Sequence, residues 1–154
     1  MANELTMLKN SSLFKDMSDA VVQEFLDKSI TKRFAKDELL YAEMQENEDI
    51  GFILEGQVRA EVTIDKEGSG IDLGQGEFLG LVKFLQHESS VALLTASAKT
   101  DSCLLIWKAS DWRRICDQDT ETGYTLALRI GRVLVKRMLD WHMNVLNNVA
   151  WGIE

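Results

Sequence analysis

The chain has 154 residues, of which 45% are hydrophobic and 27% charged, and its formal net charge is −8. This length suits one domain with a single core, and the negative charge argues against unaided binding to the phosphate backbone of nucleic acid. No apolar run is long enough to span a bilayer, and the first residues lack the basic-then-apolar order of a signal peptide. We therefore expect one cytoplasmic domain over residues 1–154, with no nucleic-acid partner and no membrane partner.

Residues 1–30 are predicted to hold the N-terminal helices. Between Leu8 and Ile30, apolar residues at positions 21, 22, 25 and 26 recur at three- and four-residue steps, which is the period of an amphipathic helix. Ser18 precedes them and suits a helix N-cap, because its hydroxyl can accept a hydrogen bond from a free N–H at the helix start.

From about residue 31 the hydrophobic period shortens toward two, which indicates β-strands. The short apolar segments, separated by turn residues, are 31–35, 38–42, 51–64, 71–73 and 102–107. Gly56 lies at a predicted hairpin turn within the third of them. Repeated short strands at this spacing predict a sandwich or a jelly roll over residues 31–108.

Residues 109–150 are predicted to form a short helix that starts at Ser110 and a long helix from about residue 121 to residue 149. The long helix carries two apolar stripes. The first stripe comprises Leu126, Ile130 and Val133, and the second comprises Ala127, Gly131, Leu134, Met138, Trp141 and Val145. The second has the spacing of a two-stranded coiled coil. Because two stripes are hard to cover in so small a monomer, we expect one to cover the barrel and the second to form a homodimer interface.

One segment points to a family. The sequence GQGEFLGLVKFL at residues 74–85 is followed, after a polar gap, by VALLTA at residues 91–96. Its closely spaced glycines indicate a backbone that turns tightly or lets another group approach. In order and spacing it resembles the phosphate-binding cassette of the cyclic nucleotide-binding domain, the family of catabolite activator protein and the protein kinase A regulatory subunits. The LFKDMS entry at residues 13–18 and the hairpin at Gly56 are similar to the same family.

The resemblance implies a mainly β fold, a double-stranded β-helix (jelly roll) of eight strands with N-terminal helices and a long C-terminal dimer helix. It also implies a non-enzymatic regulatory role in signal transduction, in which a ligand under the cassette biases a hinge near residues 117–123 and moves that helix. The family's transcription factors continue into a DNA-binding domain. Because this sequence ends at Glu154, we expect a stand-alone sensor or adaptor, or one module of an assembly of separate chains.

The cassette keeps the family's frame but lacks its anion-binding side chains. Matched position by position, the family's acidic residue falls on Leu81, its arginine on Val91 and its small hydroxylated residue on Ala92. A buried anion needs a cationic fork or several converging N–H donors, so we expect no tight binding of cAMP or cGMP and no other cofactor. The remaining candidates for an anion in the cassette are the backbone amides of residues 80–82, Lys83 and His87.

Three functions stay open. In the first, aliphatic side chains of the domain fill the cavity, and the domain serves dimerisation or a protein partner. In the second, it senses a less polar small-molecule effector through Leu79, Leu81, Val91, Leu93 and Trp141 or His142. In the third, it binds a cyclic nucleotide weakly. The candidate ligand contacts are Gly80, Leu81, Val82, Lys83, Val91, Ala92, Leu93 and His142. For His142 a solvated or interface position, and for Trp141 dimer packing, are the simpler interpretations.

Catalysis is not expected. Two histidines cannot build the ligand cluster of a metal cupin, and the sequence has neither a Gly-x-Ser-x-Gly elbow nor a Walker-type phosphate loop. Cys103 and Cys116 show neither a CxxC pattern nor a metal-ligand spacing, so we interpret them as inert reduced thiols and expect no metal.

Overall fold

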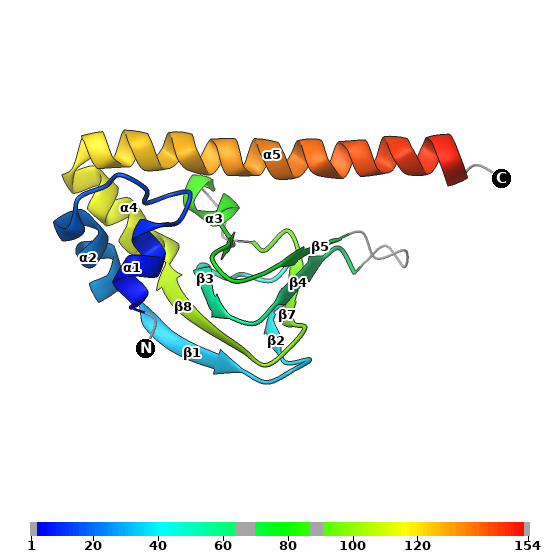
Figure 1. The fold of residues 1–154 in the computed structure, drawn as a ribbon, viewed down its shortest axis with the longest axis horizontal. Coiled ribbons are helices and arrows are strands. Elements are labelled where there is room, and N and C mark those ends of the chain that lie inside the picture. The colour runs from blue at the N-terminus through cyan, green and yellow to red at the C-terminus, as the bar shows by residue number, and fades with distance from the viewer. Residues whose placement is uncertain (1–2, 64–69, 87–90, 153–154) are drawn as a thin grey trace.

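The computed structural model describes residues 3–63, 70–86 and 91–152, with residues 148–152 described by their backbone alone. Two short helices precede a β-barrel, and two further helices follow it (Figure 1). The last helix runs along one side of the molecule and extends past the barrel.

Two N-terminal helices lie within residues 1–30, as predicted, but the helical period expected from Leu8 onward does not hold between them. Helix α1 (Glu4–Lys9) ends early, and Ser11 Oγ donates to the Leu8 carbonyl at 2.5 Å just beyond it. Asp16 has a φ of +66°, a left-handed conformation that a continuing α-helix does not contain. The predicted cap at Ser18 is confirmed, because its Oγ accepts from the Val21 N–H at 3.3 Å and α2 (Asp19–Asp27) follows it.

Eight strands of the described residues form two four-stranded antiparallel sheets, which confirms the predicted jelly roll (Figure 1). In order across the first sheet lie β1 (Ile30–Phe34), β8 (Ser102–Lys108), β3 (Asp49–Glu55) and β6 (Phe78–Leu79). In order across the second lie β2 (Leu39–Tyr41), β7 (Thr95–Ala98), β4 (Val58–Glu61) and β5 (Gly70–Leu73). Each sheet therefore joins strands from both ends of the barrel sequence, as β1 does with β8.

The predicted turn at Gly56 is confirmed between β3 and β4, but the prediction of a hairpin is wrong, because the two strands do not pair with each other. Strand β3 pairs with β6 and β8, and β4 pairs with β5 and β7. Gly56 has a φ of +93°, and a Cβ at this position would lie 2.6 Å from the carbonyl oxygen of Asp101. Both the conformation and the close approach require glycine. The turn instead carries the chain from the first sheet to the second.

The buried side chains form two clusters. The larger lies between the first sheet and the helices, and its aromatic members include Phe14, Phe25, Phe78, Trp107 and Trp112. Their rings meet edge to face, with 5.0 Å between the centroids of Phe14 and Phe25 and 5.2 Å between those of Trp107 and Trp112. Trp107 Nε1 donates to the Phe25 carbonyl at 2.6 Å, which ties α2 to β8. The smaller cluster lies between the inner faces of the two sheets.

Three helices complete the domain: α3 (Val82–Leu85), α4 (Ala109–Gln118) and α5 (Thr120–Gly152). The prediction of Ser110 as the cap of α4 is wrong, since the N-cap position belongs to Lys108 and no side chain caps it. At the corner between α4 and α5, Asp119 accepts from the Thr122 N–H at 3.2 Å and from its hydroxyl at 2.7 Å. In Figure 1, α5 passes over α4 and α3 before it leaves the barrel.

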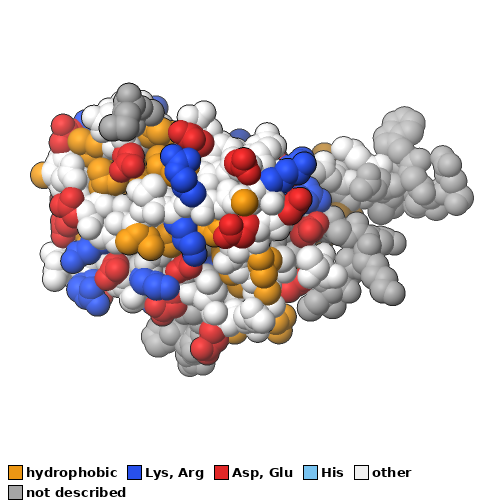
Figure 2. Space-filling view, turned by 90° about the horizontal axis from the view of Figure 1, so that it is seen from below, with side chains coloured by type: hydrophobic (Ala, Val, Ile, Leu, Met, Phe, Trp, Pro, Cys, Tyr) orange, Lys and Arg blue, Asp and Glu red, His pale blue; other side chains and the backbone are white. Residues whose placement is uncertain are grey.

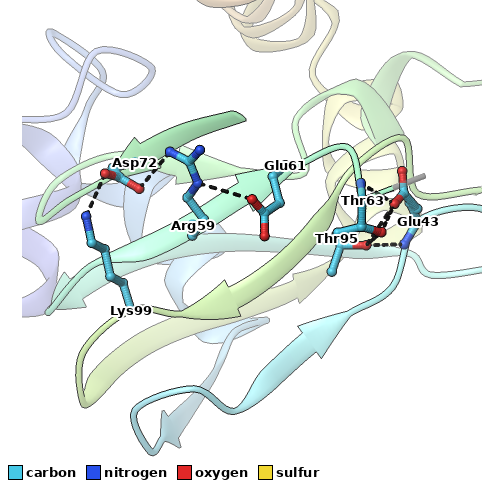
Figure 3. A network of polar contacts seen from close by, with 7 residues as sticks. All are labelled: Glu43, Arg59, Glu61, Thr63, Asp72, Thr95 and Lys99. Carbon is cyan, nitrogen blue, oxygen red and sulfur yellow. Dashed lines mark hydrogen bonds and ion pairs between the residues drawn. The ribbon is translucent and has the colours of Figure 1, made fainter. Parts of the chain in front are cut away.

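The outer face of the second sheet carries a network of polar contacts (Figure 3). Arg59 pairs with Glu61 at 3.4 Å and with Asp72 at 3.2 Å, and Lys99 reaches the other oxygen of Asp72 at 2.8 Å. Pairs as exposed as these contribute roughly 0–1 kcal/mol each. On the face shown in Figure 2, basic side chains lie among acidic ones. The network links β4 to β5 through Arg59 and Asp72, and it links β5 to Lys99, which directly follows β7.

Two glycines near β6 allow a matched test of the tight turn that leads into α3. Gly76 (φ +85°) and Gly80 (φ +77°) are both left-handed, but a Cβ at Gly80 would lie 2.5 Å from the Asp49 carbonyl oxygen, whereas one at Gly76 meets nothing within 4 Å. We expect Gly76→Ala to cost about 1–2 kcal/mol for its backbone conformation. Gly80→Ala should cost a further 1–3 kcal/mol or so for the overlap. Urea unfolding of both variants measures the difference, and equal costs would contradict the close approach at Gly80.

Candidate ligand cavity

A cavity of about 680 Å³ lies between the second sheet, α3 and the middle of α5. Its volume is in the range of small-molecule sites in proteins, roughly 300–1,000 Å³. The polar side chains among its described lining residues are those of Tyr41, Lys83 and Arg137. The apolar lining residues are Ala60, Val62, Ile71, Leu73, Leu79, Leu81, Val82, Leu93, Leu94, Leu134, Met138 and Trp141.

The turn from β6 into α3 supplies one wall of the cavity. Gly80 lets the chain pass close to Asp49, and Leu81 is buried at the start of α3. At four residues α3 is too short to gather the N–H groups of a helix N-terminus into an anion site. Of the predicted contacts, the cavity lining includes Gly80, Leu81, Val82, Lys83 and Leu93.

Val91 and Ala92, which were predicted as ligand contacts, do not line the cavity. Both are used in a short backbone ladder with the segment before β3. Val91 forms a β-bridge with Glu46, and the buried Ala92 exchanges hydrogen bonds with the backbone of Gln45 and Met44 at 3.0 and 2.8 Å. The position where the family's arginine would fall is thus committed to the protein's own backbone.

Helix α5 supplies the opposite wall and divides the predicted dimer seam. Leu126, Ile130 and Val133 pack on the core, as predicted for the first stripe. From the second stripe, Leu134, Met138 and Trp141 line the cavity. The side chain of His142, another predicted ligand contact, is exposed and does not line the cavity.

The outward side of α5 carries an open groove of about 470 Å³. Ala127 and Gly131 of the predicted seam lie in this groove, whereas Val145 lines neither it nor the cavity. Large apolar side chains along the same helix are well exposed, 49% at Val135 and 57% at Leu139. The remaining groove residues are Leu128, Arg132 and Lys136.

Lys83 is buried at 1% exposure, and the protein itself satisfies its ammonium. Its Nζ donates to Asn47 Oδ1 at 2.7 Å and to the Asp49 carbonyl at 3.1 Å, and it lies 3.5 Å from the centroid of the Tyr41 ring. Asn47 Oδ1 also accepts from the Asp49 N–H at 2.9 Å. This side chain therefore fastens α3 to the start of β3 instead of presenting a free charge to the cavity.

Burial shifts the pKa values of Lys83 and Tyr41 in opposite directions. It lowers the pKa of Lys83 to about 8, with Asp49 acting against that shift and Lys108 adding to it. Burial, followed by the charge of Asp49, raises the pKa of Tyr41 well above its ordinary value, so its hydroxyl stays neutral.

Arg137 is the charged lining residue that the sequence analysis did not predict. It comes from the middle of α5, its side chain is partly buried, and its Nη2 donates to the Phe78 carbonyl at 2.6 Å. Burial lowers its pKa, while Glu77 and Tyr41 act in the opposite direction. The signal was present, because Arg137 continues the inward stripe of Leu126, Ile130 and Val133 by one more four-residue step. The cavity therefore contains a guanidinium that the cassette alone does not reveal.

Both cysteine thiols are free and buried. Burial raises the pKa of Cys103, and burial with the charges of Asp117 and Asp119 raises that of Cys116 to about 11. Within the described ranges, no group of three or more His, Cys, Asp or Glu side chains could hold a metal ion. No helix in this part of the chain is long and apolar enough to cross a membrane.

Comparison with known proteins now identifies the family. The model of the cyclic nucleotide-binding domain matches residues 31–119, more than half of the chain. The chain belongs to the cyclic nucleotide-binding domain family. Domains of this family are regulatory and not catalytic. No curated protein matches the sequence at a significant level.

Solved structures share the cyclic nucleotide-binding fold. A cyclic nucleotide-binding domain from Methylobacillus flagellatus is similar with a TM-score of 0.79 and 16% identity, over 94% of this chain and 81% of the other. The N-terminal domain of a transcriptional regulator from Streptomyces coelicolor is similar with a TM-score of 0.68 and 21% identity, over 85% of this chain and 92% of the other. The catabolite activator protein of Thermus thermophilus is similar with a TM-score of 0.70 and 19% identity, over 89% of this chain and 63% of the other. At these identities the likeness establishes the fold.

The buried Lys83 predicts a pH dependence of stability. Below pH 8 the ammonium is protonated in both states, and the full penalty of burying it is present. Between about 8 and its ordinary value of 10.5 the folded state releases the proton first. The unfolded state then binds more protons, so the stability contributed by this residue rises with pH. From about pH 7.5 to about pH 9.5 the parent should gain roughly 1–2 kcal/mol relative to Lys83→Met.

Urea unfolding at the two pH values measures this gain, with the exposed Lys36→Met as the matched lysine substitution. A parent and a Lys83→Met protein whose stabilities change in parallel with pH would show that the Lys83 ammonium is not held in a low-dielectric site.

Proposed function

We propose that this domain is a regulatory sensor whose barrel cavity takes a small, largely apolar ligand in place of cAMP or cGMP. The supporting observation is the cavity itself, about 680 Å³ in volume and walled by aliphatic side chains from the second sheet, α3 and α5. A cavity filled by its own side chains, the alternative that the sequence left open, would not leave this volume. The function is thus binding and response, with no chemical step.

The cassette is unsuited to a cyclic nucleotide. Leu81 and Val91 occupy the positions of the family's ribose and phosphate contacts, and neither side chain offers a hydrogen bond. Losing two charged hydrogen bonds, at about 1.5–3 kcal/mol each, lowers affinity by a hundredfold or more. Apolar surface instead gains about 25 cal/mol for each Å² removed from water. The balance favours an apolar ligand.

Response to the ligand is expected through α5. Leu134, Met138 and Trp141 form the helix side of the cavity, while α3 and the second sheet form the other side. A ligand between them adds contacts that exist only when the helix lies against the barrel, so it biases the helix position. The corner at Asp119 is where such a movement would turn, which agrees with the hinge expected near residues 117–123.

We further propose that two copies associate through the outward groove of α5. The large apolar side chains on this face recur at heptad-related steps along the helix: Leu128, Val135, Leu139 and Leu146, which are 41–57% exposed. Gly131 lies in the groove and lets a second helix approach closely. This interface replaces the predicted seam, because three members of that seam are used by the cavity.

The ligand proposal is tested with decanol as a neutral apolar probe. Titration calorimetry should detect its binding to the parent but none of cAMP. Met138→Gln should weaken decanol binding several-fold, because it places an amide in the cavity wall. Met143→Gln is the matched control, because Met143 lies on the same helix and does not line the cavity. Its side chain is 53% exposed, compared with 61% for Met138. Micromolar binding of cAMP, or equal effects of the two substitutions, would contradict the proposal.

The dimer proposal is tested by two substitutions at equal exposure. Val135 and Trp141 are both 49% exposed, but the first lies in the outward groove and the second lines the cavity. We expect Val135→Asp to halve the mass measured by light scattering, because it buries an unpaired carboxylate between helices. Trp141→Asp should leave the mass unchanged. The reverse result would restore the seam predicted from the sequence, and a monomeric parent would exclude the dimer.

A further inference from the structure

Two of the described residues that line the cavity carry positive charge, and they differ in what satisfies them. Lys83 has two oxygen acceptors and the face of Tyr41 around its ammonium. Arg137 makes one hydrogen bond, from Nη2 to the Phe78 carbonyl, and no ion pair with a described residue. Among the described lining residues, the guanidinium is therefore the charge that has no ion pair, and the carboxylate of Glu77 acts on it through its charge alone.

Such a group is suited to a bound anion. A guanidinium stays protonated and presents five N–H donors in a planar fork, of which one bond to Phe78 uses a small part. Burial disfavours its charge, as the direction of its pKa shift indicates, and an anion within the cavity would offset that penalty. A carboxylate matches the fork with two parallel hydrogen bonds.

We propose that the cavity takes an amphiphilic organic acid, with its carboxylate on Arg137 and its apolar body against Leu79, Leu81 and Leu134. This inference rests on the proposed function and names the class of ligand. One guanidinium neutralises one carboxylate, whereas a phosphate monoester carries about −1.5 to −2 charges and would remain partly unpaired. A cyclic phosphate diester carries the same single charge as a carboxylate, but its ribose would also need the hydrogen bond that Leu81 cannot supply. Arg137 is then the residue that determines specificity for acids over neutral apolar molecules.

The same residue connects the ligand to the helix. Arg137 lies midway along α5, and its bond to Phe78 joins that helix to β6, directly before the cassette turn. A carboxylate on the fork would strengthen the attachment of α5 to the barrel when the cavity is occupied. A neutral ligand of the same length would fill the cavity without adding this charged link.

The test compares decanoate, decanol and decylamine, which share a ten-carbon chain and differ in the head group. We expect the parent to bind decanoate at least tenfold more tightly than decanol, and decylamine most weakly, by titration calorimetry. Arg137→Gln should remove the preference for decanoate while leaving decanol within about twofold. Arg137→Lys, which keeps the charge but loses the fork, should retain part of it. Arg33→Gln, an exposed arginine on β1, is the control of equal charge change.

The outcomes separate the two proposals. If the parent binds decanol and decanoate equally, or if Arg137→Gln and Arg137→Lys both keep the full preference for decanoate, the acid specificity is wrong and the apolar sensor stands. If neither decanol nor decanoate binds, the sensor proposal itself fails and this inference fails with it. Loss of decanoate preference in Arg33→Gln as well would show a general charge effect and overturn the role of Arg137.

Discussion

The fastening of the cassette to the start of β3 is the constraint on which the rest of this domain depends. Lys83 Nζ donates to Asn47 and Asp49, and the Asp49 carbonyl also lies where a side chain at Gly80 would have to be. A buried ammonium is tolerated only where oxygen atoms replace its lost water. The protein's own donors and acceptors therefore hold the turn, and the turn keeps its shape although Leu81 offers nothing to an anion.

Helix α5 is the element that can move relative to this fixed turn. Met138 and Leu139 are neighbours in sequence, yet one lines the cavity and the other the outward groove, because successive residues of an α-helix point about 100° apart. A modest rotation of α5 about its own axis therefore alters both surfaces at once. Packed interfaces of this kind shift between discrete arrangements, so a single element can relate cavity occupancy to the way two copies meet.

Features set by local chemistry were predictable from the sequence. Ser18 caps its helix and Gly56 turns the chain between β3 and β4, because a hydroxyl and a left-handed backbone act within a few residues. The alternation of apolar residues and the spacing of turns were enough for the jelly roll. The failures are tertiary in origin: Asp16 interrupts the first helical run, and the backbone continuing from β8 displaces Ser110 from its expected cap position.

The site was predictable only in part, because a resemblance transfers positions and not partners. Val91 stands where the family's arginine would stand, but its backbone is engaged with Glu46 and its side chain does not line the cavity. Arg137 was overlooked for the converse reason, since a search for apolar stripes ends at the first charged residue. A charged residue that continues an inward apolar stripe is a more informative signal of a binding site than another apolar residue would be. Burying a charge is costly, so such a residue suggests that something in the cavity compensates for it. In this domain the cassette supplies the shape of the cavity, and the helix supplies a guanidinium that has no ion pair among the described residues.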